Sequence, residues 1–180
     1  MGYFLAIDIP DDTVQDLKSF ELPSASALYH QRRADLHITL AYLGPIPEDQ
    51  LDNFIEKLCT IDAKPFSVSG QGVRCFGPGA RYRNYFLTAA IDLNDHLKKL
   101  KDQIDRVATA CGFPPRNHGD GFQPHITLAR SDEAVAEEDI VRFKQNNADA
   151  VVSPFQVTSF ALYQSQHPKP YKKICDIGMD

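Results

Sequence analysis

The segment Leu36 to Ala41 reads LHITLA, and its last five letters return unchanged at His125 to Ala129. At average residue frequencies, a five-residue identity within a chain of 180 residues arises by chance roughly once in a hundred sequences. One five-residue identity is therefore suggestive, and the sequence around each copy must show whether the identity belongs to a longer repeat.

The flanks of the two copies repeat in the same order. Tyr3-Phe4-Leu5 precedes the first copy and Tyr85-Phe86-Leu87 the second, while Pro65-Phe66-Ser67-Val68 and Pro154-Phe155-Gln156-Val157 follow them. The offsets are 82, 88 and 89 residues. Such self-similarity predicts an internal duplication. We expect one bilobed domain over 1–180, with repeats at about 3–76 and 84–163 and a C-terminal strand near 171–177.

The composition fits a globular intracellular protein. Hydrophobic residues make up 43% and charged residues 24%, enough for one domain with a substantial core. No basic leader and no bilayer-length apolar segment is present, so we expect a cytoplasmic protein without membrane contact. The net charge of −5 argues against a protein that neutralises many phosphates along a polynucleotide. Four widely spaced cysteines are predicted to be reduced and mostly buried: Cys59, Cys75, Cys111 and Cys175.

Apolar periodicity predicts strand, helix, HITLA strand, helix and strand in each half. The helix expected from Asn94 to Cys111 has a capping residue, one apolar stripe and a stop at Gly112 and Pro114. Single strands are expected at 66–76 and 155–163, and a short helix at 137–144. The expected fold class is α+β, with two antiparallel sheets flanking a central cleft and helices on the outside.

Side-chain alternation along a strand divides the first motif between two faces. One face is predicted to carry His37, Thr39 and Ala41, and the opposite face Ile38, Leu40 and Tyr42. A histidine and a threonine two positions apart have roots roughly 6.5–7 Å apart, so both can touch one phosphate-sized group. Two copies would bring two imidazoles and two hydroxyls to one site.

This set of side chains suits phosphoryl transfer between oxygens. An imidazole with a pKa of about 6.5 can accept or donate a proton near neutrality, and each such role contributes about 10²–10⁴ in rate. Threonine hydroxyls would hold the non-bridging oxygens. For either motif alone a structural role is the alternative, because threonine is also a good strand former. A two-histidine metal site is a further alternative, although no third histidine or carboxylate stands nearby to complete the ligands.

The sequences LHITLA and FQPHITLAR look like the paired HxTx signatures of the 2H phosphoesterases, and the chain most resembles the RNA 2',3'-cyclic phosphodiesterases, also called 2'-5' RNA ligases. The likeness extends from FLAIDIP at 4–10 to FALYQS at 160–165. It implies His37 as proton donor, His125 as proton acceptor, and Thr39 and Thr127 as phosphate-binding partners. It implies no metal and no nucleotide cofactor. The implied reaction converts RNA 2',3'-cyclic phosphate ends to 2'-phosphomonoesters, with 2'-5' ligation as a secondary activity.

Further substrate-binding candidates lie near the motifs. Arg130 matches the family, although alternation places it opposite His125 unless the strand ends or twists. Phe122 fits the family's F-x-P-H pattern and is a candidate for stacking on a base, or alternatively for the core. The chain departs from the family at Tyr85-Phe86, where the resemblance leads us to expect a tryptophan. Candidates for the rim of the cleft are Arg32, Arg33, Arg81, Arg83 and Arg116.

The expected partners are RNA or oligonucleotide ends with a 2',3'-cyclic phosphate, bound by a monomer. Two other functions stay open. The first is a cyclic phosphodiesterase for small nucleotides or ADP-ribose derivatives, which a comparison of cyclic mononucleotides with cyclic-ended oligonucleotides would distinguish. The second is a non-catalytic module that binds RNA ends, against which the intact histidine pair counts.

Overall fold

The computed structural model describes residues 2–24, 28–77, 84–116, 121–165 and 171–180. Its helices are α1 (Asp11–Leu17), α2 (Glu48–Leu58), α3 (Asp95–Ala110) and α4 (Glu137–Asn146), and a 3-10 turn covers Arg33–Asp35. Its strands are β1 (Gly2–Asp8), β2 (Tyr29–His30), β3 (His37–Gly44), β4 (Phe66–Gln71), β5 (Val73–Phe76), β6 (Tyr85–Ala90), β7 (His125–Ser131), β8 (Val151–Val157), β9 (Ser159–Ser165) and β10 (Lys172–Gly178). The predicted helix at 137–144 is thus confirmed.

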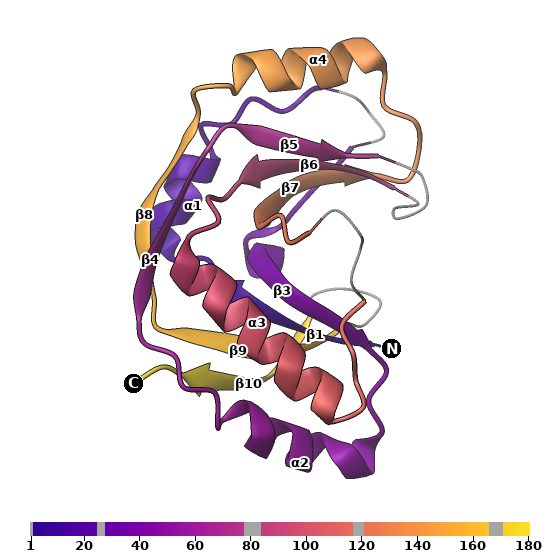
Figure 1. The fold of residues 1–180 in the computed structure, drawn as a ribbon. Coiled ribbons are helices and arrows are strands. Elements are labelled where there is room, and N and C mark those ends of the chain that lie inside the picture. The colour runs from indigo at the N-terminus through magenta and orange to yellow at the C-terminus, as the bar shows by residue number, and fades with distance from the viewer. Residues whose placement is uncertain (1, 25–27, 78–83, 117–120, 166–170) are drawn as a thin grey trace.

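The strands pair in antiparallel fashion. One path runs β10-β9-β1-β3-β7-β6-β5, β2 pairs with β7 beside this path, and β4 pairs with β8 in a separate two-stranded sheet. A single residue pair, Ile38 with Ile126, joins β3 to β7 in the described chain. The long path is therefore one sheet with two halves, which join only between β3 and β7 in the described chain (Figure 1). The predicted α+β class with antiparallel sheets is confirmed.

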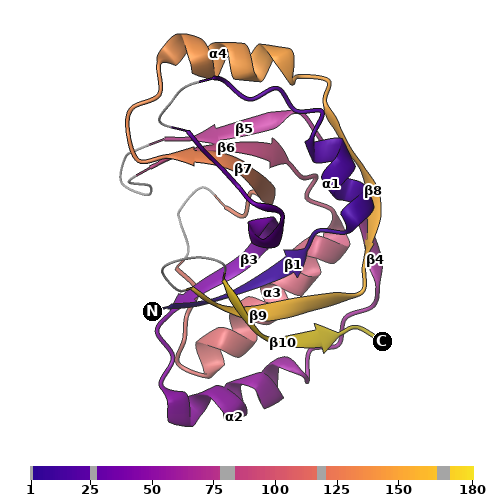
Figure 2. The ribbon, with the colours of Figure 1, turned by 180° about the vertical axis from the view of Figure 1, so that it is seen from behind.

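The helices lie around these sheets. Figure 1 shows α4 along the β5, β6 and β7 half, and α2 and α3 on the other half. The reverse view in Figure 2 shows α1 beside β8, which it contacts. α3 packs against β3 and α2. This arrangement leaves β3 and β7 in the middle of the molecule.

The two halves pair their strands in the same register. In each half the first strand of the repeat pairs with the HITLA strand through a β-bulge, a point where one strand has one residue more than its partner. The pairs on either side of the bulge are Leu5 with Ala41 and Ala6 with Thr39 in one half, and Leu87 with Ala129 and Thr88 with Thr127 in the other. On this basis we propose that the chain is one bilobed domain of two repeats, 3–76 and 84–163, with β10 added.

Two strands that the sequence predicts as continuous are each divided. The segment 66–76 breaks at Gly72, whose φ of +73° favours glycine, and the chain then changes its partner strand from β8 to β6. The segment 155–163 breaks at Thr158, between β8 and β9. The prediction of single strands was wrong because apolar side chains recur on both sides of each break, whereas at Gly72 and at Thr158 the chain changes its partner strand.

The core joins both halves with the apolar stripes of the helices. α3 buries Leu97, Leu100, Ile104 and Ala108. Asn94 Oδ1 accepts a hydrogen bond of 2.9 Å from the Leu97 amide, which is the predicted N-cap. Gly112 follows the helix with a φ of +85°. The predicted helix is confirmed, and the burial of its stripe fixes it against β3.

None of the helices in the described part of the chain combines the length and apolar character that crossing a bilayer requires. The four cysteines are free thiols, as predicted. The expectation that they are mostly buried was wrong, since Cys59 is exposed and the other three are partly exposed. Burial raises the pKa of the Cys75 and Cys175 thiols, so both are protonated at neutral pH.

Candidate active site

The two HITLA strands lie side by side at the centre of the molecule. Ile38 and Ile126 are Cα partners across β3 and β7, and both are fully buried. Because successive side chains point to opposite faces, the histidine and threonine on either side of each isoleucine share the other face. All four side chains are partly exposed there: His37, Thr39, His125 and Thr127. The structure thus brings together the four residues that the motifs single out.

The bulges change which residues share this face. After Thr39, the consecutive residues Leu40 and Ala41 are both buried, and Tyr42 is exposed again. The prediction that Ala41 lies with His37 and Tyr42 lies opposite was therefore wrong. The extra residue of a bulge reverses the alternation beyond it.

The same reversal applies to Arg130. Leu128 and Ala129 are both buried, and Arg130 is partly exposed like the threonine before the bulge. Burial raises the pKa of the Tyr171 phenol, and Arg130 lies close enough for its positive charge to oppose that rise. The Tyr171 ring lies edge-on to the His37 ring at 5.7 Å between centroids. Arg130 therefore lies on the histidine side of the sheet, contrary to simple alternation.

His37 is held at both ring nitrogens. Nδ1 lies 2.8 Å from the carbonyl oxygen of Asp35, and since a carbonyl can only accept, Nδ1 carries the proton. Nε2 lies 3.0 Å from Thr39 Oγ1. The ring also packs against Phe4, with centroids 5.1 Å apart. These contacts direct Nε2 and the threonine hydroxyl to the same point.

His125 has the same backbone anchor in a different environment. Nδ1 donates to the carbonyl oxygen of Gln123 at 2.8 Å, so a neutral ring has its lone pair on Nε2. Burial lowers the pKa of His125, the bond to Gln123 opposes this, and the nearby charge of Arg74 adds to the lowering. The ring lies 4.8 Å from the Phe76 ring. A neutral imidazole whose Nδ1 is bonded to the backbone has its lone pair on Nε2 and is suited to accept a proton there.

An aromatic cluster on the His37 side is not predicted by the motifs. The Phe4 ring contacts Tyr171 edge-on at 5.0 Å and stacks on Tyr163 at 5.3 Å between centroids. Burial raises the pKa of Tyr171, as do Asp35 and Tyr42, against the opposing effect of Arg130. Tyr171 thus stays a neutral phenol beside His37. Tyr171 is the first residue of the predicted last strand, and β10 begins one residue later at Lys172, so its sequence position gave no signal for this contact.

The other candidates occupy varied places. Phe122 is partly buried against the core, with Lys101 Nζ 5.6 Å from its ring centre. Its role in stacking on a base stays a prediction. Arg116 lies over the Tyr42 ring, 5.4 Å from its centroid, and its amide donates to the Tyr42 carbonyl at 2.9 Å.

Arg32 and Arg33, also predicted for the rim, each pair with an aspartate. Arg32 Nε bonds to Asp35 Oδ2 at 3.1 Å. Arg33 pairs with Asp11 at 2.6 Å. Arg81 and Arg83 lie outside the described residues. Of the three arginines that the structure describes, Arg116 lies beside Tyr42, a residue of the histidine face.

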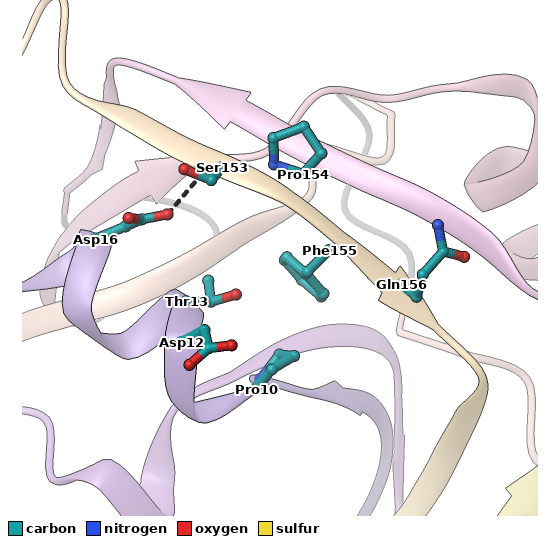
Figure 3. Close-up of a pocket in the computed structure, with 8 residues that line it drawn as sticks. All are labelled: Pro10, Asp12, Thr13, Asp16, Ser153, Pro154, Phe155 and Gln156. Atoms are coloured by element: carbon teal, nitrogen blue, oxygen red, sulfur yellow. Dashed lines mark hydrogen bonds between the residues drawn. The ribbon is translucent and has the colours of Figure 1, made fainter.

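A pocket of about 500 Å³ lies between α1 and β8 (Figure 3). It is lined by Pro10, Asp12, Thr13, Asp16, Ser153, Pro154, Phe155 and Gln156. None of the motif residues lines it, and two of its side chains are carboxylates, which repel a phosphate. Among the described residues, no three of the His, Cys, Asp and Glu side chains are grouped to hold a metal ion. The chemistry of the histidine and threonine pairs therefore makes them the candidate active site.

Residues 8–169 match the family model described as the 2'-5' RNA ligase superfamily. An RNA 2',3'-cyclic phosphodiesterase of Archaeoglobus fulgidus is 28% identical over 168 residues, which cover 92% of this chain and 91% of that protein. The Aeropyrum pernix protein of the same name is 28% identical over 131 residues, covering 73% of each chain.

Solved structures share the fold. TT0787 of Thermus thermophilus aligns with a TM-score of 0.74 at 19% identity, covering 99% of this chain and 98% of that one. LigT of E. coli complexed with 3'-AMP aligns with a TM-score of 0.71 at 21% identity, covering 99% and 97%. At these identities the likeness establishes the architecture.

Proposed function

The chain belongs to the 2'-5' RNA ligase superfamily, and from this premise we propose that it hydrolyses 2',3'-cyclic phosphates at RNA ends to 2'-phosphomonoesters, without a metal ion. The predicted kinship with the 2H phosphoesterases is confirmed by the family match. Relatives named RNA 2',3'-cyclic phosphodiesterase over most of the chain confirm the prediction of an enzyme of this class. The acid and base roles, the metal independence and the product belong to the proposal.

The observation that carries the proposal is the meeting of two histidine and threonine pairs across Ile38 and Ile126. Each imidazole is anchored through Nδ1 to a backbone carbonyl two residues earlier, which turns Nε2 away from that carbonyl, and in His37 towards Thr39 Oγ1. Anchoring a ring in one tautomer is what general acid and base catalysis requires of a histidine.

In the proposed step, a water molecule attacks phosphorus while His125 Nε2 takes its proton. The bond between phosphorus and O3' breaks, and protonated His37 gives the Nε2 proton to O3', so the phosphate stays on O2'. The hydroxyls of Thr39 and Thr127 donate to the non-bridging oxygens as negative charge grows on them. A second turnover needs only the return of the proton from His125 to His37 through solvent.

RNA ends are the substrates that the relatives' names favour, and a local site for one terminal phosphate agrees with the net charge of −5. Arg130 on the histidine face supports binding of a neighbouring phosphate. We treat 2'-5' joining as a secondary activity, and the acting unit as a monomer. A small cyclic nucleotide is the alternative substrate, and the crystal structure of LigT with 3'-AMP shows that a mononucleotide fits one member of this fold.

The test is hydrolysis of an oligonucleotide with a 2',3'-cyclic phosphate end in excess EDTA. Wild type, His37→Ala, His125→Ala and the control His96→Ala are compared, since His96 is exposed on α3 and stacks on Phe66. We expect full activity in EDTA for wild type and control, and losses of about 10²–10⁴ for the two motif variants. Loss of wild-type activity on chelation, or full activity of either motif variant, would refute the proposal.

A second comparison separates the substrate classes. Specificity constants are measured for 2',3'-cyclic mononucleotides, an ADP-ribose derivative that carries a cyclic phosphate, and oligonucleotides of increasing length that end in a cyclic phosphate. The proposal predicts that the oligonucleotides are preferred. Equal or better turnover of the mononucleotides would favour the small-molecule alternative, and tight binding without turnover of any of them would favour a non-catalytic binding module.

A further inference from the structure

Arg74 on β5 has no counterpart in the other half of the molecule. It pairs with Thr88 on β6, and Thr88 pairs with Thr127. The matching chain of cross-strand partners in the first half runs from Ala161 on β9 through Ala6 to Thr39. Cross-strand partners share a face of the sheet. Arg74 therefore lies on the face of His125 and Thr127, where the equivalent position beside the His37 motif carries only a methyl group.

Hydrogen bonds hold both the guanidinium and the backbone of Arg74 in place. Its Nη1 donates to the carbonyl oxygen of Pro124 at 3.0 Å, directly before His125 in the chain. The amide of Ile91 donates to the same oxygen at 3.1 Å. The hydroxyl of the buried Thr88 donates to the backbone carbonyl of Arg74 at 2.9 Å. The guanidinium is thus fixed against the turn that leads into β7.

We propose that Arg74 is a positioning residue that makes His125, and not His37, the base of the reaction. It does so by fixing the backbone in front of His125 and by placing a positive charge on the same face of the sheet. This inference rests on the proposed function and adds the reason why two pseudo-equivalent histidines take opposite roles. A positive charge next to an imidazole disfavours a second positive charge on that ring.

The surroundings of His125 agree with this role. Burial lowers the pKa of His125, the Gln123 carbonyl raises it, and the charge of Arg74 lowers it. β6 brings only Ala90 opposite His125. Apart from Arg74, the titratable or charged groups on β7 and on the strands beside it are Tyr29 and His30 on β2, His37 and Tyr42 on β3, Cys75 on β5, Tyr85 on β6, and Arg130 on β7 itself. Cys75 is a neutral thiol because burial raises its pKa.

The direct test is NMR titration of the His125 imidazole in wild type, Arg74→Met and Arg74→Lys. Methionine keeps the length of the stem and removes the charge, whereas lysine keeps the charge. We expect the pKa of His125 to rise by about half a unit to one unit in Arg74→Met and to return towards the wild-type value in Arg74→Lys. The matched control is Arg142→Met, since Arg142 is exposed on α4 and pairs only with Asp139 at 3.6 Å.

Kinetics provide the second readout. In Arg74→Met the low-pH limb of kcat/KM should move with the His125 pKa, so that the loss exceeds that at pH 8 by a factor that approaches about three to ten once the pH lies well below the His125 pKa of both proteins. An unchanged His125 pKa in folded Arg74→Met, or an equal loss at every pH, overturns the inference. Circular dichroism establishes the fold, and Arg74→Gln replaces the methionine variant if that variant is unfolded.

The two proposals can fail separately. The NMR titration reports on His125 whether or not the protein turns over substrate. Full activity of His125→Ala would refute the proposed function whatever the titration shows. Loss of activity in His125→Ala together with an unmoved His125 pKa in Arg74→Met would refute only the role of Arg74.

Discussion

The two halves of the molecule present the same histidine and threonine in the same way but surround them differently. Each imidazole donates from Nδ1 to a carbonyl two residues earlier, at 2.8 Å in both halves. His37 then lies among aromatic rings, with Nε2 at 3.0 Å from Thr39 Oγ1. His125 has the charge of Arg74 nearby, and within the described chain no residue bonds to its Nε2.

The two halves share the positions of their histidine and threonine side chains and differ in the residues around them. The repeated register and the shared bulge place two equivalent pairs on one face. Acid and base catalysis needs two groups in opposite protonation states, and different surroundings fix which of the two is protonated. The differences also extend to the residue after each bulge, which is Tyr42 in one half and Arg130 in the other. Under the proposed mechanism, the divergent neighbours decide which histidine accepts the proton.

The largest expected effect comes from removing each histidine in turn. His125→Ala should lower kcat/KM by about 10²–10⁴ and abolish the low-pH limb of its profile, because the base is gone. His37→Ala should cost a similar factor and keep that limb, because His125 still titrates. Profiles of kcat/KM against pH on a cyclic-ended oligonucleotide check this. Loss of the limb in His37→Ala instead would reverse the assignment of roles.

Replacing the threonines should have the next largest effect and should differ between the halves. Thr39→Val and Thr127→Val each remove one donor to the developing charge, at a cost of about 10²–10³ in kcat. The loss should be greater for Thr39→Val, because its hydroxyl also contacts His37 Nε2. Serine at either position keeps the hydroxyl and should restore most activity. Equal losses for both valine variants would contradict this difference.

The two HITLA strands end differently, and this predicts a smaller effect on stability. Gly44 has a φ of +80° and a Cβ there would lie 3.3 Å from Arg116 Nη2, so Gly44→Ala should cost about 1–2 kcal/mol. At the equivalent end, the buried Ser131 hydroxyl bonds to both the amide and the carbonyl of Glu133, and Ser131→Ala should cost about 1–3 kcal/mol. Urea unfolding measures both.

The control for the glycine variant is Gly178→Ala. Its φ is not positive and nothing lies within 4 Å of an added Cβ, so its free energy of unfolding should stay within about 0.5 kcal/mol of wild type. A Gly44→Ala variant as stable as Gly178→Ala would show that the end of β3 relaxes without cost.

The smallest expected effect is on the pH dependence of stability. Because the pKa of His125 is lower in the folded protein than its ordinary value, the unfolded chain binds this proton more readily. Stability should therefore fall as the pH drops below about 6.5, the ordinary value of histidine. His125→Gln should reduce the fall in Tm between pH 7 and pH 5, and His96→Gln should leave it unchanged. An identical fall in His125→Gln would contradict the lowered pKa.

Much of the fold could be predicted from local patterns. The cap at Asn94 and the apolar stripe of α3 are where the sequence places them, because both depend on residues within a few turns of one helix. The breaks at Gly72 and Thr158 were missed, since a strand that changes its partner keeps its apolar pattern. Arg74 was missed for a related reason. The sequence of β5 does not predict a hydrogen bond from Arg74 to Pro124, which lies fifty positions away.

The sequence by itself determined that the chain contains two copies of one motif, and that histidine and threonine in each copy can act on a phosphate. These statements depend only on residue identity and on alternation along a strand. The tertiary structure alone decided that Arg130 shares the histidine face and that Arg74 lies near His125. Both depend on how separate strands pair, through a bulge and through cross-strand register. That pairing is a property of non-local contacts, which no local period contains.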